Sequence, residues 1–350
     1  MDTLNVGYSY SPWPLTEARR RPIENISPRI KIKDISELVD AESRLTKELR
    51  GSSQTEEVKA ELSAALADVE VLYCGDSPDK LLSRAPKLRW LQCIWDGVDT
   101  TVAPEVIQSH VVVTNAKGSA SIAIAEWVLT VMVMFSKRIP AYFADKVNRK
   151  WDPRPDHTYE LGGKTVGIVG MGDIGKEVAR LAKAYYMRVL ATRRSAVVRQ
   201  VSVGDVDELL PLGDLPYLLS ESDFVVLCVP LNRETSKMIG ERELKLMRPT
   251  AYLINIARGG VIEEPVLIKA LQEGWIAGAA LDVFSTEPLP SESEIWNLPN
   301  VIFTPHISGE TNLYVKRMDA IFCENLRRYV AGEELNNVVD KNLGYPLPKG

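Results

Sequence analysis

The stretch Thr165–Gly175, TVGIVGMGDIG, decides the fold of this chain. Its first five residues are typical of a buried parallel strand, and three glycines, Gly170, Gly172 and Gly175, follow in the pattern G-x-G-x-x-G. The first glycine permits a tight turn, the second leaves room for a pyrophosphate, and the third lets a helix pack closely on the strand. The residues after the turn place apolar side chains on one helical face: Ile174, Val178, Leu181, Ala182 and Tyr185. Strand, turn and helix together indicate a dinucleotide-binding site rather than a glycine turn without a ligand.

Three polar residues follow other predicted strands. Arg258 comes after AYLINIA, Glu287 shortly after GAALDV, and His306 after VIFTP. In open parallel sheets, ligands bind outside the carboxyl ends of the strands, so we expect these side chains at one working edge of a sheet.

These three residue types suit hydride transfer to or from a 2-keto acid. That reaction needs a cation to hold the carboxylate and polarise the ketone, and an acid to protonate the forming alkoxide. Arg258 offers a planar, permanently charged guanidinium, and a histidine such as His306 can serve both directions of the reaction. A carboxylate beside the imidazole favours its protonated form and fixes its orientation, which is the role we assign to Glu287. His110, before VVVTN, and His157, in a Pro-rich loop, are interpreted as structural or solvated residues.

These segments resemble the D-isomer-specific 2-hydroxyacid dehydrogenase family, especially its glyoxylate and hydroxypyruvate reductase branch. The resemblance covers most of the chain and rests on segments in the family's order and spacing: LGGKTVGIVGMGDIGKEVARLAKA, SDFVVLCVPLNRETSKMIG, LMRPTAYLINIARGGVIEE, GAALDVFSTEPLP and LPNVIFTPHISG. It implies an α/β fold of two Rossmann-like doubly wound parallel-sheet domains, a flavodoxin-like substrate domain and a dinucleotide-binding domain, with a cleft between them. It also implies that Arg258, Glu287 and His306 are the catalytic residues, and that Asp282, in LDVF, contacts the nicotinamide carboxamide.

The resemblance extends the expected binding sites. WDGVD, from Trp95 to Asp99, is similar to the loop whose backbone N–H groups receive the substrate carboxylate, which assigns substrate binding to Gly97 and Val98 together with Arg258. Taken alone, a Gly-Val pair after an apolar strand is a turn. The expected cofactor site comprises Gly170, Gly172, Asp173, Ile174, Gly175, Arg193, Arg194, Ser195, Val229, Pro230, Ala257 and Asp282.

The end of the next predicted strand, RVLAT, bears on the choice of cofactor. NAD enzymes of this architecture place an acid there to bind the adenosine ribose, whereas this chain has Arg193, Arg194 and Ser195. No carboxylate occurs between Glu177 and Asp205, an interval whose basic residues are Arg180, Lys183, Arg188, Arg193, Arg194 and Arg199. Because guanidinium groups suit a 2′-phosphate, we predict NADP(H), with NAD(H) as the second choice. A solvated basic turn is the alternative interpretation of these arginines.

The composition is that of an ordinary globular protein. The 350 residues are enough for two domains that each bury a core, and a net charge of −5 with 25% charged residues gives no sign of a nucleic-acid face. The cysteines, Cys74, Cys93, Cys228 and Cys323, lack the spacing of a zinc site, so we expect reduced thiols, no metal and a cytoplasmic location. The amino terminus does not resemble a signal peptide, and no apolar run is long enough to span a membrane.

One apolar run needs burial on more than one side. IAIAEWVLTVMVMF, from Ile122 to Phe135, is apolar almost all round its predicted helix. A subunit interface would bury it, and by resemblance such a helix packs across a dimer, so we expect a homodimer. The alternative is a helix wholly inside one subunit.

We expect residues 1–118 and 309–350 to form the substrate domain and residues 119–308 the NAD(P)-binding domain. Strand-like runs in the first part are LNVGYSY, VEVLYCG, RWLQCIW and HVVVTN, and an amphipathic helix from Leu313 to Val330 returns to it. Two chain crossings predict a hinged cleft that closes over the substrate. IKIKDI, within residues 29–56, fits a strand, and the polar residues after it fit a surface helix and loop.

The expected function is hydride transfer between NADP(H) and C2 of a small 2-keto or 2-hydroxy acid, with the D configuration implied by the resemblance. Glyoxylate and hydroxypyruvate are the first substrates to consider, and bulkier keto acids stay open. A phosphite- or formate-type dehydrogenase on the same scaffold is one alternative, although formate enzymes carry glutamine where Glu287 stands. An NAD(P)-sensing binding protein of the corepressor type is the other.

Overall fold

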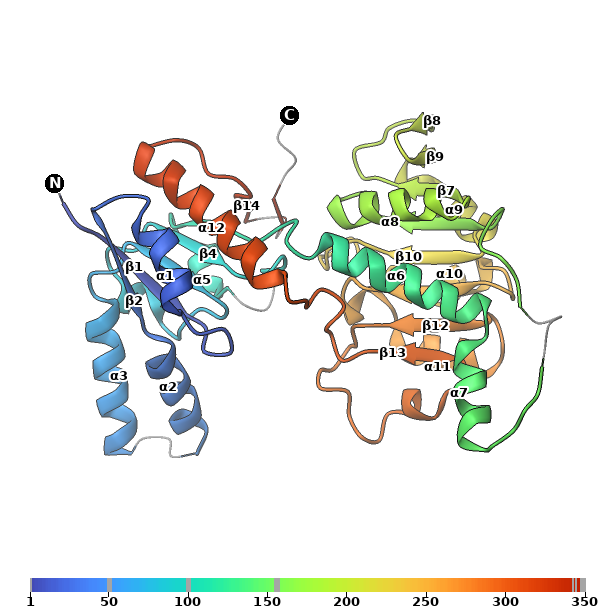
Figure 1. Ribbon diagram of the computed structural model, residues 1–350, viewed down its shortest axis with the longest axis horizontal. Coiled ribbons are helices and arrows are strands. Elements are labelled where there is room, and N and C mark those ends of the chain that lie inside the picture. Colours follow the sequence, from blue (N-terminus) through green and yellow to red (C-terminus); the bar gives the residue numbers. More distant parts are fainter. Residues whose placement is uncertain are drawn as a thin grey trace. The chain divides into compact units, whose positions relative to one another are not determined.

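The computed structural model describes residues 2–48, 52–98, 102–153, 158–341, 343 and 345–346. The chain divides into two compact units (Figure 1), of which unit 1 is Met1–Ser119 with Thr311–Gly350 and unit 2 is Ala120–Glu310. Each unit is built around its own sheet and is described by itself. His157 and Asp99, which the sequence analysis named, lie outside the described residues.

Unit 1 is a parallel sheet in the order β2-β1-β3-β4-β5, which is the flavodoxin-like order of doubly wound folds. Its strands are β1 (Leu4–Ser9), β2 (Ile30–Asp34), β3 (Val71–Cys74), β4 (Trp90–Cys93) and β5 (Val112–Thr114). Its helices are α1 (Glu17–Glu24), α2 (Ser36–Glu48), α3 (Ser53–Leu66), α4 (Leu81–Arg84), α5 (Pro104–Ile107) and α12 (Tyr314–Ala331). A short antiparallel pair, β14 (Val339–Asp340) and β15 (Tyr345–Pro346), follows α12.

The late helix α12 belongs to the core of unit 1. Phe322 of α12 is fully buried and stacks on Tyr73 of β3, with ring centroids 4.1 Å apart. Asp319, one turn earlier, forms a bidentate pair with Arg19 of α1, with Nε–Oδ2 at 2.7 Å and Nη2–Oδ1 at 2.8 Å. Residues from both ends of the chain therefore complete a single core.

Unit 2 has the dinucleotide-fold strand order, β13-β12-β11-β10-β6-β7-β9-β8, and all of its pairs are parallel except β8 with β9. Its strands are β6 (Thr165–Val169), β7 (Arg188–Thr192), β8 (Gln200–Val203), β9 (Val206–Leu210), β10 (Phe224–Leu227), β11 (Tyr252–Asn255), β12 (Gly278–Leu281) and β13 (Val301–Phe303). Its α-helices are α6 (Ser121–Ser136), α7 (Ile139–Val147), α8 (Asp173–Ala184), α9 (Leu215–Glu221), α10 (Glu241–Leu246) and α11 (Glu264–Gln272). Short 3₁₀ helices are η2 (Leu212–Asp214), η3 (Gly259–Val261) and η4 (Glu294–Asn297).

A β-hairpin takes the place of a crossover helix between β7 and β9. The four residues of β8 are all exposed, and β8 is the edge strand of the sheet. Ser202, in the middle of β8, has a left-handed backbone with φ +55°. This hairpin was not predicted from the sequence.

The apolar helix α6 is largely buried by its own chain. Ten of its 16 residues are buried within the single chain, and α6 packs beside α8 along one face of the unit 2 sheet (Figure 1). This burial corresponds to the alternative of a helix inside one subunit. The homodimer stays a prediction.

Candidate functional site

The glycine turn after β6 has the geometry of a phosphate cradle. Gly170 has φ +103°, and a Cβ atom there would lie 2.7 Å from the carbonyl oxygen of Cys228. A Cβ atom on Gly175 would lie 2.5 Å from the carbonyl oxygen of Gly170, so the first turn of α8 packs directly on the loop. Gly172, in contrast, is exposed and would meet no atom within 4 Å. The open side of the turn therefore faces outward beside the N-terminus of α8, where a pyrophosphate would fit.

The other predicted cofactor residues lie around this turn. Asp173 and Ile174 form the start of α8. Val229 and Pro230 follow β10, and a Cβ atom on Gly170 would be 2.9 Å from Cγ1 of Val229. Ala257 follows β11, and Arg193, Arg194 and Ser195 follow β7. Because β7, β6, β10 and β11 are consecutive in the parallel sheet, these residues share one edge.

Most of the basic residues near β7 are paired with carboxylates. Arg180 pairs with Glu177, Lys183 with Asp207, and both Arg188 and Arg199 pair with Glu208. Burial alone would raise the pKa of Asp207, but hydrogen bonds from the Val189 N–H and from Lys183 bring that pKa below its ordinary value. The positive charge seen in the sequence is thus largely neutralised in the folded unit.

Arg193 differs from these neighbours. Its backbone N–H donates to the carbonyl oxygen of Leu210 at 3.1 Å, and its carbonyl accepts from Ala196 at 3.0 Å. Within the described part of the chain, no carboxylate forms an ion pair with its guanidinium, which is half-buried at the end of β7. Arg193, which we predict to lie near the adenosine ribose, therefore has no carboxylate partner among the described residues.

His306 and Glu287 form the closest pair among the predicted catalytic residues. Nδ1 of His306 lies 2.8 Å from Oε2 of Glu287, and the two side chains are 46% and 37% exposed. The other oxygen of Glu287, Oε1, accepts from the backbone N–H of Phe284 at 2.9 Å. The carboxylate is thus fixed between the backbone after β12 and the imidazole ring, and Nε2 is the ring nitrogen that faces away from this bond.

Asp282 fixes the loop that carries His306. Its carboxylate is 2% exposed and accepts hydrogen bonds from Thr304 Oγ1 (2.5 Å), from the Ile307 N–H (3.0 Å), and from both the N–H and the hydroxyl of Ser308. His306 itself has φ +57°, a conformation that costs backbone energy and needs support from its surroundings. The contact of Asp282 with the nicotinamide carboxamide, which the family resemblance implies, stays a prediction.

Arg258 lies at the same edge, immediately after β11. Its Nη1 donates to the carbonyl oxygen of Ala257 at 2.8 Å, and Asn255 Nδ2 donates to the carbonyl of Arg258 at 3.0 Å. A Cβ atom on the next residue, Gly259, would overlap the backbone of Phe284 at 1.9 Å. The absence of a side chain there lets the Arg258 segment lie directly against the segment that leads to Glu287.

The predicted substrate-carboxylate loop lies in unit 1, after β4. Val98 is buried, Gly97 is half-buried, and the carbonyl of Val98 accepts from the Val102 N–H at 3.2 Å. Asp96 Oδ1 accepts from the Ser119 hydroxyl at 3.0 Å, which anchors the loop to the start of the following segment. Trp95 belongs to an aromatic cluster at this carboxyl edge, with Tyr10, Trp13 and Tyr314.

Two features of the site were missed by sequence reasoning. The anchoring of the His306 loop by Asp282 had no signal, because it depends on tertiary hydrogen bonds between the segments that follow β12 and β13. The ion-pair cluster of Arg188, Arg199 and Glu208 had a partial signal, namely the acidic residues of DVDE after the basic interval.

Behind the cradle, desolvation raises the pKa of the Cys228 thiol to about 12, which favours the protonated form at neutral pH. Across the residues that the structure covers, no group of three or more His, Cys, Asp or Glu side chains could hold a metal ion. Over the same residues, no helix combines the length and apolarity needed to cross a bilayer.

Comparisons with known proteins agree with this geometry. The family model of the D-isomer specific 2-hydroxyacid dehydrogenase, NAD binding domain, matches residues 129–308. The glyoxylate reductase of Thermococcus gammatolerans is 40% identical over 276 residues, which cover 75% of this chain and 80% of that protein. The glyoxylate reductase of Pyrococcus furiosus is 39% identical, with 75% of this chain and 79% of that protein covered.

Solved structures extend the similarity to nearly the whole chain. A D-isomer specific 2-hydroxyacid dehydrogenase family protein from Aeromonas salmonicida has a TM-score of 0.79 and 25% identity, covering 97% of this chain and all of that one. A D-isomer specific 2-hydroxyacid dehydrogenase from Xanthobacter autotrophicus, in complex with NADPH and MES, has a TM-score of 0.77 and 25% identity, covering 99% of this chain and all of that one. The chain belongs to the D-isomer specific 2-hydroxyacid dehydrogenase family, and it is an oxidoreductase that acts on 2-hydroxyacids with a nicotinamide dinucleotide.

Proposed function

We propose that the protein is an NADP(H)-dependent reductase of small 2-keto acids, of the glyoxylate and hydroxypyruvate type, that forms the D-hydroxyacid. The observation that carries the proposal is the His306–Glu287 pair. His306 lies on a loop that buried Asp282 anchors, at the carboxyl edge of the unit 2 sheet. The glyoxylate reductases among the relatives support the substrate class.

The proposed chemistry assigns one task to each residue. When bound, the reduced cofactor supplies the hydride. Arg258 binds the substrate carboxylate and polarises the C2 carbonyl, while the N–H groups of Gly97 and Val98 hold the carboxylate from unit 1. His306, oriented by Glu287 through Nδ1, donates the proton from Nε2 to the forming alkoxide, and accepts it in the reverse direction. Unit 1 is accordingly the substrate domain and unit 2 the NADP(H)-binding domain.

The cofactor preference rests on Arg193. Its guanidinium is the cation at the end of β7 that no carboxylate of the described chain neutralises, so it can pair with a 2′-phosphate without losing an existing partner. The Xanthobacter autotrophicus relative, whose structure contains NADPH, supports the same choice.

The proposed assembly is a homodimer that uses the region of α7. No residue of α7 is buried, and Phe143 and Val147, one turn apart, are 58% and 82% exposed. Trp151, just after the helix, is 95% exposed. Exposed apolar side chains in such a group favour an interface, and sedimentation of the protein at low concentration tests it.

A substrate panel with both cofactors tests the enzymatic proposal. Glyoxylate, hydroxypyruvate and bulkier 2-keto acids are assayed with NADPH and NADH, and the products are resolved by chiral chromatography. We expect reduction of the small acids, a higher kcat/KM with NADPH, and D products where C2 becomes chiral. Binding of NADPH without turnover of any keto acid would favour the sensing protein, and oxidation of phosphite would favour the other alternative.

A further inference from the structure

The segment that follows β7 contributes little to the core of unit 2. Between Arg193 and Arg199 only Ala196 is buried, whereas Val197 and Val198 are 87% and 63% exposed. Packing therefore does not fix the path of this segment, which carries the cation proposed to bind the 2′-phosphate. Its position depends on the polar contacts at its two ends.

The first end is held by the backbone. Arg193 donates its N–H to Leu210 of β9, and Ala196 donates to the carbonyl of Arg193, which closes a tight turn. These bonds fix the residue where the segment leaves the sheet, but they do not reach its second half.

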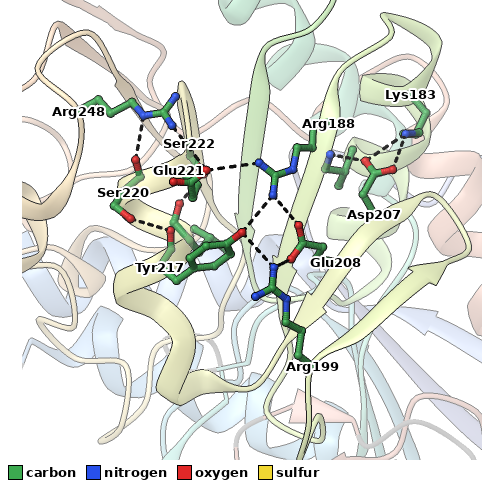
Figure 2. Close-up of polar contacts among 12 residues, drawn as sticks. Lys183, Arg188, Arg199, Asp207, Glu208, Tyr217, Ser220, Glu221, Ser222 and Arg248 are labelled. Carbon is green, nitrogen blue, oxygen red and sulfur yellow. Dashed lines mark hydrogen bonds and ion pairs between the residues drawn. The ribbon is translucent and has the colours of Figure 1, made fainter.

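The second end is held by side chains in addition to the β8–β9 ladder, in which Gln200, next to Arg199, pairs with Leu209. Figure 2 shows Arg188, Arg199, Glu208 and Tyr217 pointing toward one another at the edge of the sheet. Nη2 of Arg199 donates to Glu208 Oε2 and, at 3.0 Å, to the hydroxyl of Tyr217, while its guanidinium lies 4.6 Å from the centre of the Tyr217 ring. Glu208 Oε1 accepts from Arg188 at 2.5 Å, and Arg188 also reaches Tyr217 at 3.1 Å.

Glu208 is the centre of this arrangement. Its side chain is 14% exposed, and its two oxygens each face a guanidinium. Since both arginines also share the Tyr217 hydroxyl, loss of the carboxylate would leave two cations close together with no charge between them. Arg188 would keep Glu221, at 3.4 Å, whereas Arg199 would have no other carboxylate in the described chain.

We propose that Glu208, acting through Arg199 and Tyr217, is a positioning residue that holds the Arg193–Arg199 segment so that Arg193 meets the 2′-phosphate of NADP(H). The inference rests on the proposed NADP(H) preference. Glu208 would then contribute to the discrimination between NADP(H) and NAD(H) without contacting either cofactor.

The test measures cofactor binding without substrate. Dissociation constants for NADPH and NADH, and for the fragments adenosine 2′,5′-bisphosphate and 5′-AMP, are determined by calorimetry for the wild type and for Glu208→Gln. We expect Glu208→Gln to weaken NADPH and the bisphosphate about ten-fold, while NADH and 5′-AMP change less than about two-fold. Arg199→Gln, which replaces a 46% exposed side chain and leaves Glu208 paired with Arg188, should give the same selective loss if Glu208→Gln folds poorly.

Glu221→Gln is the matched control. This change removes a carboxylate partner of Arg188 in the same cluster but no contact of Arg199. The ratio of the NADPH and NADH dissociation constants of the variant should therefore equal that of the wild type. If Arg193→Ala loses the NADPH preference but Glu208→Gln and Arg199→Gln behave like Glu221→Gln, the positioning role is wrong and the proposed function stands. If the wild type itself does not distinguish NADPH from NADH, the cofactor preference fails first and the positioning role with it.

Discussion

Nδ1 of His306 lies 2.8 Å from Oε2 of Glu287, and the second oxygen of that carboxylate is held by the backbone N–H of Phe284. The ring therefore has one nitrogen engaged by protein and one available to the reaction. Glu287→Gln keeps the shape of the side chain but removes the carboxylate that pairs with Nδ1 and orients the ring, so we predict a fall in kcat of about 100-fold with a small change in KM. His306→Ala should reduce kcat by about 100- to 10,000-fold.

Steady-state kinetics across pH with saturating cofactor check this first prediction. Cofactor dissociation constants for both variants serve as the control and should match the wild type. Near-wild-type kcat in His306→Ala at every pH would remove the proton-donor assignment.

Arg258 should affect both binding and turnover. Arg258→Lys keeps the charge but loses the planar pair of N–H donors, so we predict a rise in KM for the keto acid together with a lower kcat, for a loss of kcat/KM of about 100-fold. The measurement is keto-acid kinetics at saturating NADPH. A change confined to KM would mean that Arg258 binds the ground state and the transition state equally.

The three glycines of the cradle should respond differently to alanine. Gly170→Ala introduces strain at φ +103° and a contact of 2.7 Å with a carbonyl, and Gly175→Ala forces a Cβ atom within 2.5 Å of another carbonyl. Both should lower the free energy of unfolding by about 1–3 kcal/mol. Gly172→Ala meets no protein atom within 4 Å, so it should fold normally and lose affinity for the dinucleotide instead.

Thermal unfolding and cofactor calorimetry, run on the same samples, separate these effects. Gly213→Ala is a suitable control, since a Cβ atom there also meets nothing within 4 Å and Gly213 lies outside the cradle. Unchanged dinucleotide affinity in Gly172→Ala would argue against a pyrophosphate at this turn.

Asp319 should be important for the stability of unit 1. The Arg19–Asp319 side chains are only 13% and 17% exposed, and Tyr73 also donates to Asp319, at 3.0 Å. Desolvation opposes the charge on Arg19, but its hydrogen bond and ion pair with Asp319 raise the pKa of Arg19 well above its ordinary value. Asp319→Asn leaves this cation without its counter-ion, so we predict a loss of about 3 kcal/mol in the free energy of unfolding.

Urea unfolding measures this loss. Glu17→Gln is the matched control because it breaks the exposed pair of Arg21 and Glu17, whose side chains are 72% and 64% exposed, and should cost less than about 0.5 kcal/mol. Equal midpoints for the two variants would contradict a structural role for the buried pair.

The sequence predicted the parts of the fold that depend on local pattern. TVGIV and RVLAT are the strands β6 and β7 with the expected bounds, because parallel strands that are buried on both faces are rich in consecutive apolar residues. The β8–β9 hairpin was missed because β8 is only four residues long and entirely exposed. Val201 and Val203 do alternate with polar residues, but so short an alternation is a weak signal for a strand. Helix α6 shows a different limit, since hydropathy indicates that a helix is buried but does not identify the chain that buries it.

In the site, too, local patterns could be predicted from the sequence and tertiary contacts could not. Arg258, Glu287 and His306 could be chosen because each follows an apolar strand, and strand ends gather at one edge. The pairing of Arg188 with Glu208, 20 residues later, narrows a conclusion drawn from charge counts, because several cations of the basic interval pair with carboxylates once the chain folds back. Arg193 is the cation on which the cofactor prediction then depends. Tertiary contacts of this kind leave no periodic trace in a sequence.

The left-handed backbone of Ser202 has a consequence for how the protein behaves in crowded solution. An edge strand with valines exposed, such as Val201 at 71%, would ordinarily offer a template on which another polypeptide could add a strand. Because Ser202 turns the chain out of the extended conformation in the middle of β8, an incoming strand meets an interrupted row of donors and acceptors. The margin of the sheet is thereby protected against cross-β polymerisation without any charged residue in the strand.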